Sequence, residues 1–145
     1  MPLNNFAIQG MLDLLFNNTA FAIVGDTAGL QPSATTGSFW VSLHTADPGA
    51  SGNQTTSEIS YTVYARVSVA RTSAGWVRTS NTYDPTAPIT FGACTAGSGT
   101  VTHAGIGTAS SGTGHLLWSG PVTPNIAVSS GITPELETSS TITIT

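Results

Sequence analysis

The chain is 145 residues long and nearly without charge, since three Arg, no Lys and seven Asp or Glu make up 7% of it. An ordinary soluble domain has about a quarter of its residues charged. The net charge of −4 argues against a nucleic-acid or anionic-membrane partner, because both are bound through a stripe of cations. A chain that does without charge for solubility is expected to work packed against neighbours, as a component of an assembly.

The first predicted element is a helix from Asn4 to Asn17. Asparagines at both ends can cap its start and stop it, and Gly10 weakens it by about 1 kcal/mol relative to Ala. Its broad apolar face must lie on a sheet of its own chain or on a neighbouring subunit. The residues of that face recur at spacings of three and four, and they are Phe6, Ile8, Met11, Leu12, Leu15 and Phe16.

Short segments of alternating polar and apolar residues follow, and they predict strands. The clearest are Ser38 to Thr45, Tyr61 to Arg71, Gly99 to Ala109, His115 to Ser119 and the β-branched tail Thr141 to Thr145. Between the first two, the small polar residues 49–57 predict a mobile loop. The tail can join its own sheet or the edge of a neighbour's sheet.

About eight such segments at the spacing of a sandwich, with no βαβ rhythm, predict an all-β fold. We expect a two-sheet antiparallel sandwich, a jelly roll of about eight strands, with one short N-terminal helix. The expected organisation is a single domain over 1–145, with an N-terminal helical arm at 1–20 and the β-sandwich at 38–145. Because the first cation is Arg66, no basic leader precedes an apolar run, and synthesis in the cytoplasm without export is expected.

No group of residues predicts a catalytic, cofactor or metal site. His44 and Asp47 stand three apart, but Pro48-Gly49 follow, and Asp before Pro-Gly is typical of a turn. His103 and His115 lie on strands joined by a turn, yet two histidines without a further ligand make a poor metal site. No Gly-x-Ser-x-Gly elbow is present. The sequence therefore indicates a protein that is not an enzyme.

Two weaker patterns leave room for carbohydrate chemistry. Glu135 and Glu137 could serve as the paired carboxylates of a sugar-acting enzyme, although solvated surface acids are the simpler interpretation. The tryptophans could stack on sugars, although packing in a core or an interface is favoured, and they are Trp40, Trp76 and Trp118.

Four blocks of sequence resemble a family of small virion proteins of tailed bacteriophages. They lie in the order Ser42 to Gly49, Tyr64 to Arg71 with Gly75-Trp76 close behind, Thr102 to Gly112, and Ala127 to Pro134. The resemblance covers about Leu12 to Pro134. Some members of the family are capsid cement (decoration) proteins with a jelly-roll fold, and others carry the label of tail-fibre proteins.

The resemblance implies a cement protein on the outer surface of the capsid that bridges subunits of the major capsid protein and stabilises the shell. It also implies self-association, as a homodimer rather than a trimer. The alternative is a tail-fibre or host-recognition module that uses exposed aromatics and the loop at 47–57 to bind cell-surface glycan. For contacts with neighbours we select the helix and the tail, unless both simply close the core; the interface candidates are Phe6, Met11, Leu15, Phe16, Ile142 and Ile144.

Overall fold

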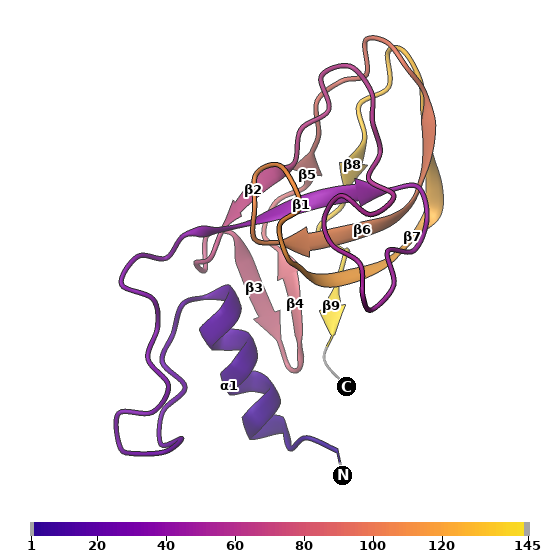
Figure 1. The fold of residues 1–145 in the computed structure, drawn as a ribbon. Coiled ribbons are helices and arrows are strands. Elements are labelled where there is room, and N and C mark those ends of the chain that lie inside the picture. The colour runs from indigo at the N-terminus through magenta and orange to yellow at the C-terminus, as the bar shows by residue number, and fades with distance from the viewer. Residues whose placement is uncertain (1, 144–145) are drawn as a thin grey trace. The chain divides into compact units, whose positions relative to one another are not determined.

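The computed structural model describes residues 2–143 (Figure 1). Their contacts divide the chain into two compact units, which are described separately. Unit 1 combines residues 2–38, 70–88 and 137–143, and unit 2 combines residues 39–69 and 89–136. Residues 70–88, which the sequence assigned to the sandwich, thus pack with the N-terminal helix. That the chain is one domain stays a prediction.

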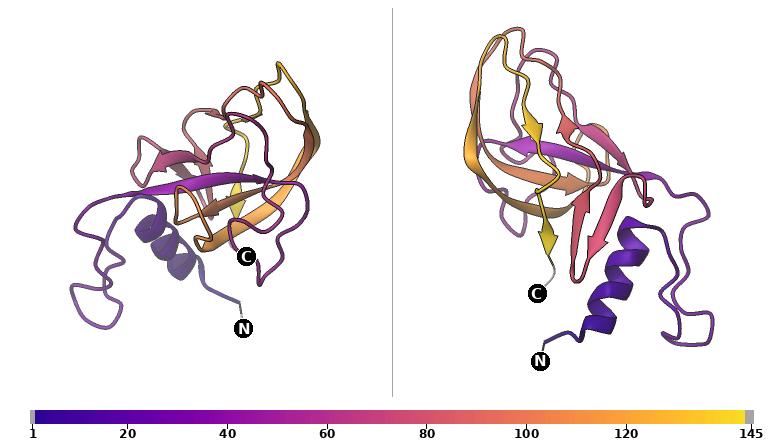
Figure 2. Two further views of the ribbon diagram at one scale, coloured as in Figure 1. Left: turned by 45° about the horizontal axis from the view of Figure 1, so that its top comes forward. Right: turned by 180° about the vertical axis from the view of Figure 1, so that it is seen from behind.

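Unit 1 contains the predicted helix and a small sheet. Helix α1 spans Asn5–Phe16, and the side chain of Asn4 caps it by accepting from the Phe6 amide at 3.0 Å. Strands β3 (Trp76–Thr79), β4 (Thr82–Pro85) and β9 (Ile142–Thr143) form an antiparallel sheet in the order β3-β4-β9. Figures 1 and 2 show α1 beside the β3-β4 hairpin.

Three aromatic rings form the centre of unit 1. Phe16 stacks on Tyr83 with ring centroids 4.8 Å apart and meets Trp76 edge-on at 5.0 Å. All three side chains are fully buried. Such pairs add about 0.5–1.5 kcal/mol each beyond the burial of apolar area, so these rings hold α1 on the hairpin. On the helix, Ile8 and Leu12 continue the buried stripe one turn at a time.

Packing explains why a glycine stands at position 10 of the helix, although glycine has a low helix propensity. A Cβ atom at this position would lie 2.3 Å from the ring of Phe21, which is a buried residue of the segment that follows the helix. The missing side chain therefore lets that segment lie against α1. Phe21 is fixed there by paired backbone hydrogen bonds with Leu30, at 3.0 and 2.9 Å.

Arg71 completes the C-terminal end of α1. Its guanidinium donates to the carbonyl oxygens of Leu14, at 2.8 Å, and of Leu15, which are acceptors that the helix leaves without an intrahelical partner. A further bond reaches the Thr36 carbonyl at 3.2 Å. A cation at this position also opposes the negative end of the helix dipole.

Unit 2 is built on a four-stranded sheet in the order β2-β1-β6-β7. Its strands are β1 (Ser38–His44), β2 (Val67–Ala70), β6 (Gly99–Gly107) and β7 (Leu116–Val128), and the β1-β6 and β6-β7 pairs are antiparallel. A second antiparallel pair joins β5 (Ile89–Thr90) to β8 (Glu135–Leu136). β7 runs through Pro121 and Pro124, which an outer strand tolerates because one side of it needs no amide donors.

The core of unit 2 is formed by buried apolar side chains. Cys94 is 1% exposed and belongs to it, as expected of a small buried hydrophobe. The predicted fold class, an all-β antiparallel sandwich with one short N-terminal helix, is confirmed. The buried apolar residues are Phe39, Val41, Leu43, Ile59, Tyr61, Phe91, Cys94, Val101, Ile106, Val128 and Leu136, together with the first residue of β5, Ile89.

Candidate functional site: a buried polar centre and an adjoining pocket

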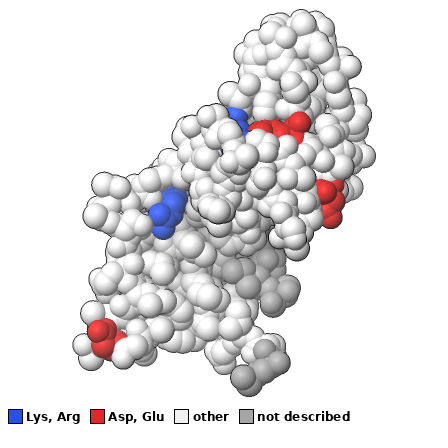
Figure 3. Space-filling model, viewed as in Figure 1, with Lys and Arg blue, Asp and Glu red and all other residues white. Residues whose placement is uncertain are grey.

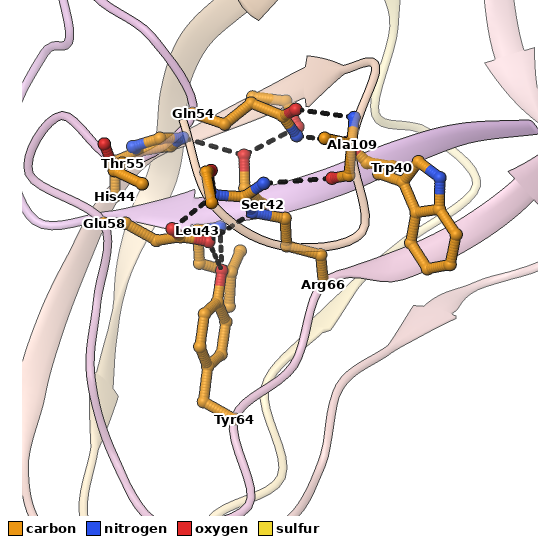
Figure 4. Close-up of polar contacts among 12 residues, drawn as sticks. Trp40, Ser42, Leu43, His44, Gln54, Thr55, Glu58, Tyr64, Arg66 and Ala109 are labelled. Atoms are coloured by element: carbon orange, nitrogen blue, oxygen red, sulfur yellow. Dashed lines mark hydrogen bonds and ion pairs between the residues drawn. The ribbon is translucent and has the colours of Figure 1, made fainter. Parts of the chain in front are cut away.

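Six polar side chains gather around β1 in unit 2, and we refer to them as the polar centre (Figure 4). They come from β1 itself, from the loop after it and from the segment that leads into β2. Most are fully or almost fully buried. Because a buried polar group must find a partner, this cluster decides how the loops around it are held. Its members are Ser42, His44, Gln54, Glu58, Tyr64 and Arg66.

A bidentate ion pair between Arg66 and Glu58 is the strongest interaction in the polar centre. Arg66 donates from Nε and Nη2 to the two carboxylate oxygens of Glu58, at 2.7 Å each. Its other donors reach the carbonyl oxygens of Ala109 at 2.9 Å and Gly112 at 2.7 Å. The hydrogen bonds and charge of Glu58 raise the pKa of Arg66, so the cation is permanent. The pair therefore fastens the β6-β7 turn to the chain before β2.

Tyr64 extends this pair to β1. Its hydroxyl donates to Glu58 Oε1 at 2.9 Å and accepts from the amide of Leu43 at 3.0 Å. Burial, followed by the charge of Glu58, raises the pKa of Tyr64, and the phenol stays neutral over the whole ordinary pH range.

Gln54 anchors the loop that the sequence predicted to be mobile. Its side chain is fully buried, accepts from the amide of Ala109 at 2.9 Å and donates to the carbonyl of Trp40 at 3.2 Å. Gly107 makes room for it, since a Cβ there would lie 2.2 Å from the Gln54 amide carbon. The mobility expected of residues 49–57 stays a prediction for the loop as a whole, but Gln54 anchors its middle, because this long polar side chain is buried next to β1.

Ser42 and His44 form a pair with the geometry of a nucleophile and its base. Ser42 Oγ lies 2.9 Å from His44 Nε2, and His44 Nδ1 lies 2.8 Å from the carbonyl of Thr56. That carbonyl can only accept, so Nδ1 carries the proton and Nε2 accepts from the serine. Both side chains are fully buried, which leaves no path for a substrate. Burial also lowers the pKa of His44, so it stays neutral. The pair is part of the packing.

The other predicted polar positions lie apart from this pair. Asp47 Oδ1 accepts from the amide of Gly49 at 2.9 Å, which confirms the turn. His103 stands opposite His44 in the β1-β6 register, and its Nδ1 lies 2.9 Å from the hydroxyl of Thr102. Glu135 accepts from the hydroxyl of Thr90 across the β5-β8 pair. Within residues 2–143, no three His, Cys, Asp or Glu side chains are grouped as metal ligands.

A pocket of about 310 Å³ opens beside the polar centre, within unit 2. One wall is the turn after β1, and the other is the start of β7; Figure 2 shows these two segments next to each other. Trp118 is one of the lining residues; its side chain is half-buried, and Phe39 meets its ring edge-on at a centroid distance of 6.0 Å. The lining residues are Asp47, Gly49, Ala50, Gly52, Leu116, Leu117, Trp118 and Ser119.

A family model described as "Podophage GP4 fiber I protein gp80" matches residues 3–144 of the chain. The chain belongs to this gp80 family. It is therefore a structural protein of a bacteriophage virion, which confirms the resemblance to phage virion proteins at that level. No curated protein matches the chain.

The interface candidates of this gp80-family chain have different surroundings. Phe6 is 56% exposed and meets Phe21 edge-on at 5.3 Å, while Met11 and Leu15 are half-buried on α1. Phe16 has no exposed surface, because it fills the aromatic centre of unit 1, and we withdraw it as a contact residue. Ile142 stands opposite Tyr83 in β9, so the start of the tail joins its own sheet. Ile144 lies outside the described residues.

Sequence reasoning missed most of the polar centre. Gln54 and Glu58 lie in a loop without periodicity, and nothing in their spacing points to burial. Arg66 did carry a signal, because it is one of only three cations and lies between small residues in a strand-like run. A cation in such a place needs a buried anion. Among residues 2–143, no helix has the length and apolar character to span a bilayer.

Proposed function

We propose that this chain is a structural subunit of a fibre on the surface of a podophage virion. The family match over residues 3–144 carries the proposal, because the model of that family is described as a fibre protein. The proposal involves no chemical step. The subunit would act by holding its shape and by adhering to other virion subunits.

The anchored loops of unit 2 support a role that needs a fixed shape. The polar centre ties the loop after β1 and the β6-β7 turn to the sheet through charged and neutral hydrogen bonds. A surface whose loops are held before binding loses little conformational entropy when a partner docks. A fibre subunit that presents such a surface outward fits this property.

An apolar surface on unit 1 supports attachment to other subunits. Four of its large apolar side chains are between 45% and 70% exposed, namely Leu3, Phe6, Ile23 and Leu30. Where such exposed apolar side chains form a contiguous patch, they favour contact with a partner. Charged atoms form only small, isolated groups on the face shown in Figure 3. We infer that copies of the chain associate with one another, as a homodimer rather than a trimer, and that Phe6, Met11 and Leu15 contribute.

A second candidate is a cement protein on the outside of the capsid. The four sequence blocks quoted above support it, and so does the charge-poor surface, which suits a subunit wedged between neighbours. In this role the chain would bridge subunits of the major capsid protein. Many weak contacts repeated over a closed shell give high avidity, and they would resist the outward pressure of packaged DNA.

Position and copy number in the virion separate the two candidates. Gold-labelled antibody against the chain, imaged on purified particles, should mark the tail region, and quantitative mass spectrometry should give few copies per particle. Labelling over the whole head, with copies in proportion to the major capsid protein, would contradict the fibre proposal and support cement. Particles that lack the chain should then also release DNA at a lower temperature.

A further inference from the structure

We propose that Ile23, in the loop that joins α1 to β1, is an anchor through which two copies of the chain bind each other. This inference rests on the proposed function, because a virion subunit that adheres to its neighbours needs such a contact. The loop covers residues 17–37 and belongs to unit 1. Figures 1 and 2 show it as a projection beside α1.

The backbone at Ile23 has a conformation that disfavours an isoleucine side chain. Its φ is 58°, in the left-handed region. Glycine and asparagine adopt this region readily, whereas a β-branched residue there is an outlier, because its side chain crowds the backbone. Ile23 is therefore held in a strained conformation. Among residues 2–143, the non-glycine residues with a positive φ are Asn18, Ile23, Ser57, Val63 and Ser80.

Ile23 is also the most exposed of the large apolar residues that the structure describes. The exposed fraction is 70%, and the next value is 58%, for Val63. Burial in a core would compensate for backbone strain, but exposure to water adds a second cost. Because both costs fall on the same residue, we infer that the side chain of Ile23 is buried by a contact with another molecule.

Other exposed apolar residues stand near Ile23. It follows Phe21 by two residues, a span of at most about 7 Å. The ring of Phe21 meets that of Phe6 edge-on at 5.3 Å, and paired backbone hydrogen bonds join Phe21 to Leu30. Phe6 and Leu30 are both about half exposed. Phe21 thus brings the backbone of three exposed apolar residues together.

The charges of this region favour an apolar, nearly uncharged partner. Residues 2–37 contain no cation, so they offer nothing to an acidic surface. Their two acids are Asp13, which bonds to Arg78 at 2.8 Å, and Asp26, whose carboxylate accepts from two backbone amides of its own turn. A basic partner would therefore find little free negative charge. The same loop of a second copy is an apolar surface of the required kind.

A two-fold dimer uses such a surface twice. Each surface meets its own counterpart, so Ile23 of one copy can pack on Phe6 and Leu30 of the other, and the reverse. Exposed side chains of this number supply only part of the about 800 Å² that each partner buries in a standard interface. The dimer is therefore weak in solution, and repetition of the contact in a virion strengthens it.

Sedimentation equilibrium of the purified full chain tests the proposal, at concentrations from about 10 μM to about 1 mM. We expect a monomer–dimer equilibrium within this range. Amide chemical shifts at residues 3–6, 21–24 and 30 should change with concentration, whereas those of the β1-β6 ladder should stay constant. A chain that stays monomeric, that forms trimers, or whose shifts change only in unit 2 would overturn the proposal.

Substitutions at the two strained β-branched positions locate the contact. Ile23→Asn suits the positive φ and removes the apolar side chain, so the dimer should weaken by about tenfold or more while the melting temperature does not fall. Val63→Asn is the matched control in unit 2, with φ 78° at the wild-type residue, and should leave dimerisation unchanged. Ile23→Met keeps an apolar side chain and should keep the dimer affinity within a few fold.

Two results with Ile23→Asn would refute the assignment. Unchanged dimer affinity would show that the contact lies elsewhere. A lower melting temperature would show that unit 1 itself needs the isoleucine side chain.

The outcome is separable from that of the fibre proposal. If gold labelling marks the tail and Ile23→Asn dimerises like the wild type, only the assignment of Ile23 fails. If the dimer depends on Ile23 but labelling covers the head, the contact stands and the fibre proposal fails.

Discussion

Each unit has buried apolar side chains, but the two units differ in the contacts that join their segments. Unit 1 is held by stacked aromatic rings, whereas unit 2 places a charged pair and four further polar side chains beside its sheet. The difference follows from what each centre must hold. Phe16, Trp76 and Tyr83 join regular elements, whose backbone groups are already paired within the helix and the hairpin. The polar centre holds irregular loops, whose amides and carbonyls need partners from side chains.

The contrast has an energetic consequence. Aromatic packing loses stability gradually when it is trimmed, because smaller apolar residues still exclude water. Removing one partner of a buried ion pair causes a large loss of stability, since the other partner remains as an uncompensated buried charge. The largest expected effect therefore lies in unit 2.

Arg66→Met should destabilise unit 2 by about 3–5 kcal/mol, because Glu58, with 15% of its side chain exposed, would lose its counter-charge. Urea unfolding gives the size, and hydrogen exchange shows which unit opens. Arg78→Met is the matched control, as its bridge to Asp13 at 2.8 Å is about one-third exposed and is worth at most about 1 kcal/mol. Adding Glu58→Gln to Arg66→Met should restore part of the loss. Equal effects of the two arginine variants would remove the distinction between the centres.

Phe16→Leu should cost unit 1 about 1–2 kcal/mol, because it keeps most of the apolar volume and loses two ring contacts. Exchange should rise in α1 and the β3-β4 hairpin and stay unchanged in the β1-β6 ladder. Phe6→Leu, at an exposed position of the same helix, should change the free energy of unfolding by about 0.5 kcal/mol or less. A loss for Phe16→Leu as large as that for Arg66→Met would contradict the graded behaviour assigned to unit 1.

Gly10→Ala tests packing against propensity within unit 1. Helix propensity alone predicts a gain of about 1 kcal/mol, but the added Cβ meets the Phe21 ring at 2.3 Å, and we expect a net loss of about 1 kcal/mol. Thermal unfolding compares Phe21→Ala with the double variant Gly10→Ala/Phe21→Ala. Without the ring of Phe21, Gly10→Ala should raise the stability. A gain from Gly10→Ala alone would show that the ring moves aside at little cost.

The last prediction concerns the pH dependence of unit 2. Burial lowers the pKa of His44 below its ordinary 6.5, so the unfolded chain takes up this proton at a higher pH than the folded one. Stability is therefore complete above about pH 6.5 and falls as the pH drops below it, until the lowered pKa is passed. The slope is at most about 1.4 kcal/mol per pH unit. Melting temperatures of His44→Gln between pH 7 and 5 should lack this slope, and those of the exposed His115→Gln should keep it.

Local pattern was enough to predict the helix and two of the main strands, but the strand predicted from Tyr61 to Arg71 is wrong in its first half, because only Val67–Ala70 (β2) is a strand and residues 61–66 are irregular. The spacing from Phe6 to Phe16 predicted α1 within a residue at each end, and alternation predicted β1 and β6, because neighbours in sequence determine both signals. The clearest strands predicted from the sequence include only the first part of β7, from His115 to Ser119. Pro121 and Pro124 follow, and the outer position of β7 in the sheet explains why the strand continues through them.

The candidate site was less predictable because its contacts are made between distant or irregular segments. Glu58 meets Arg66 across a turn without a motif, and Gln54 meets Ala109 at a separation of 55 residues. The pocket depends on the same long-range bonds. Asp47 and Trp118 were each noticed in the sequence, as a turn residue and as a possible stacking ring, but nothing local placed them in one pocket.

The contacts of the three arginines also bear on resistance to trypsin. Trypsin cleaves after Lys or Arg, and in this chain only the bonds that follow Arg66, Arg71 and Arg78 qualify. Each of these side chains is engaged within its own unit, to Glu58, to the end of α1 and to Asp13 respectively. A protease would have to pull the arginine out of these contacts before it could bind the scissile bond. The folded chain should therefore resist trypsin, and tryptic nicking would report the opening of a unit.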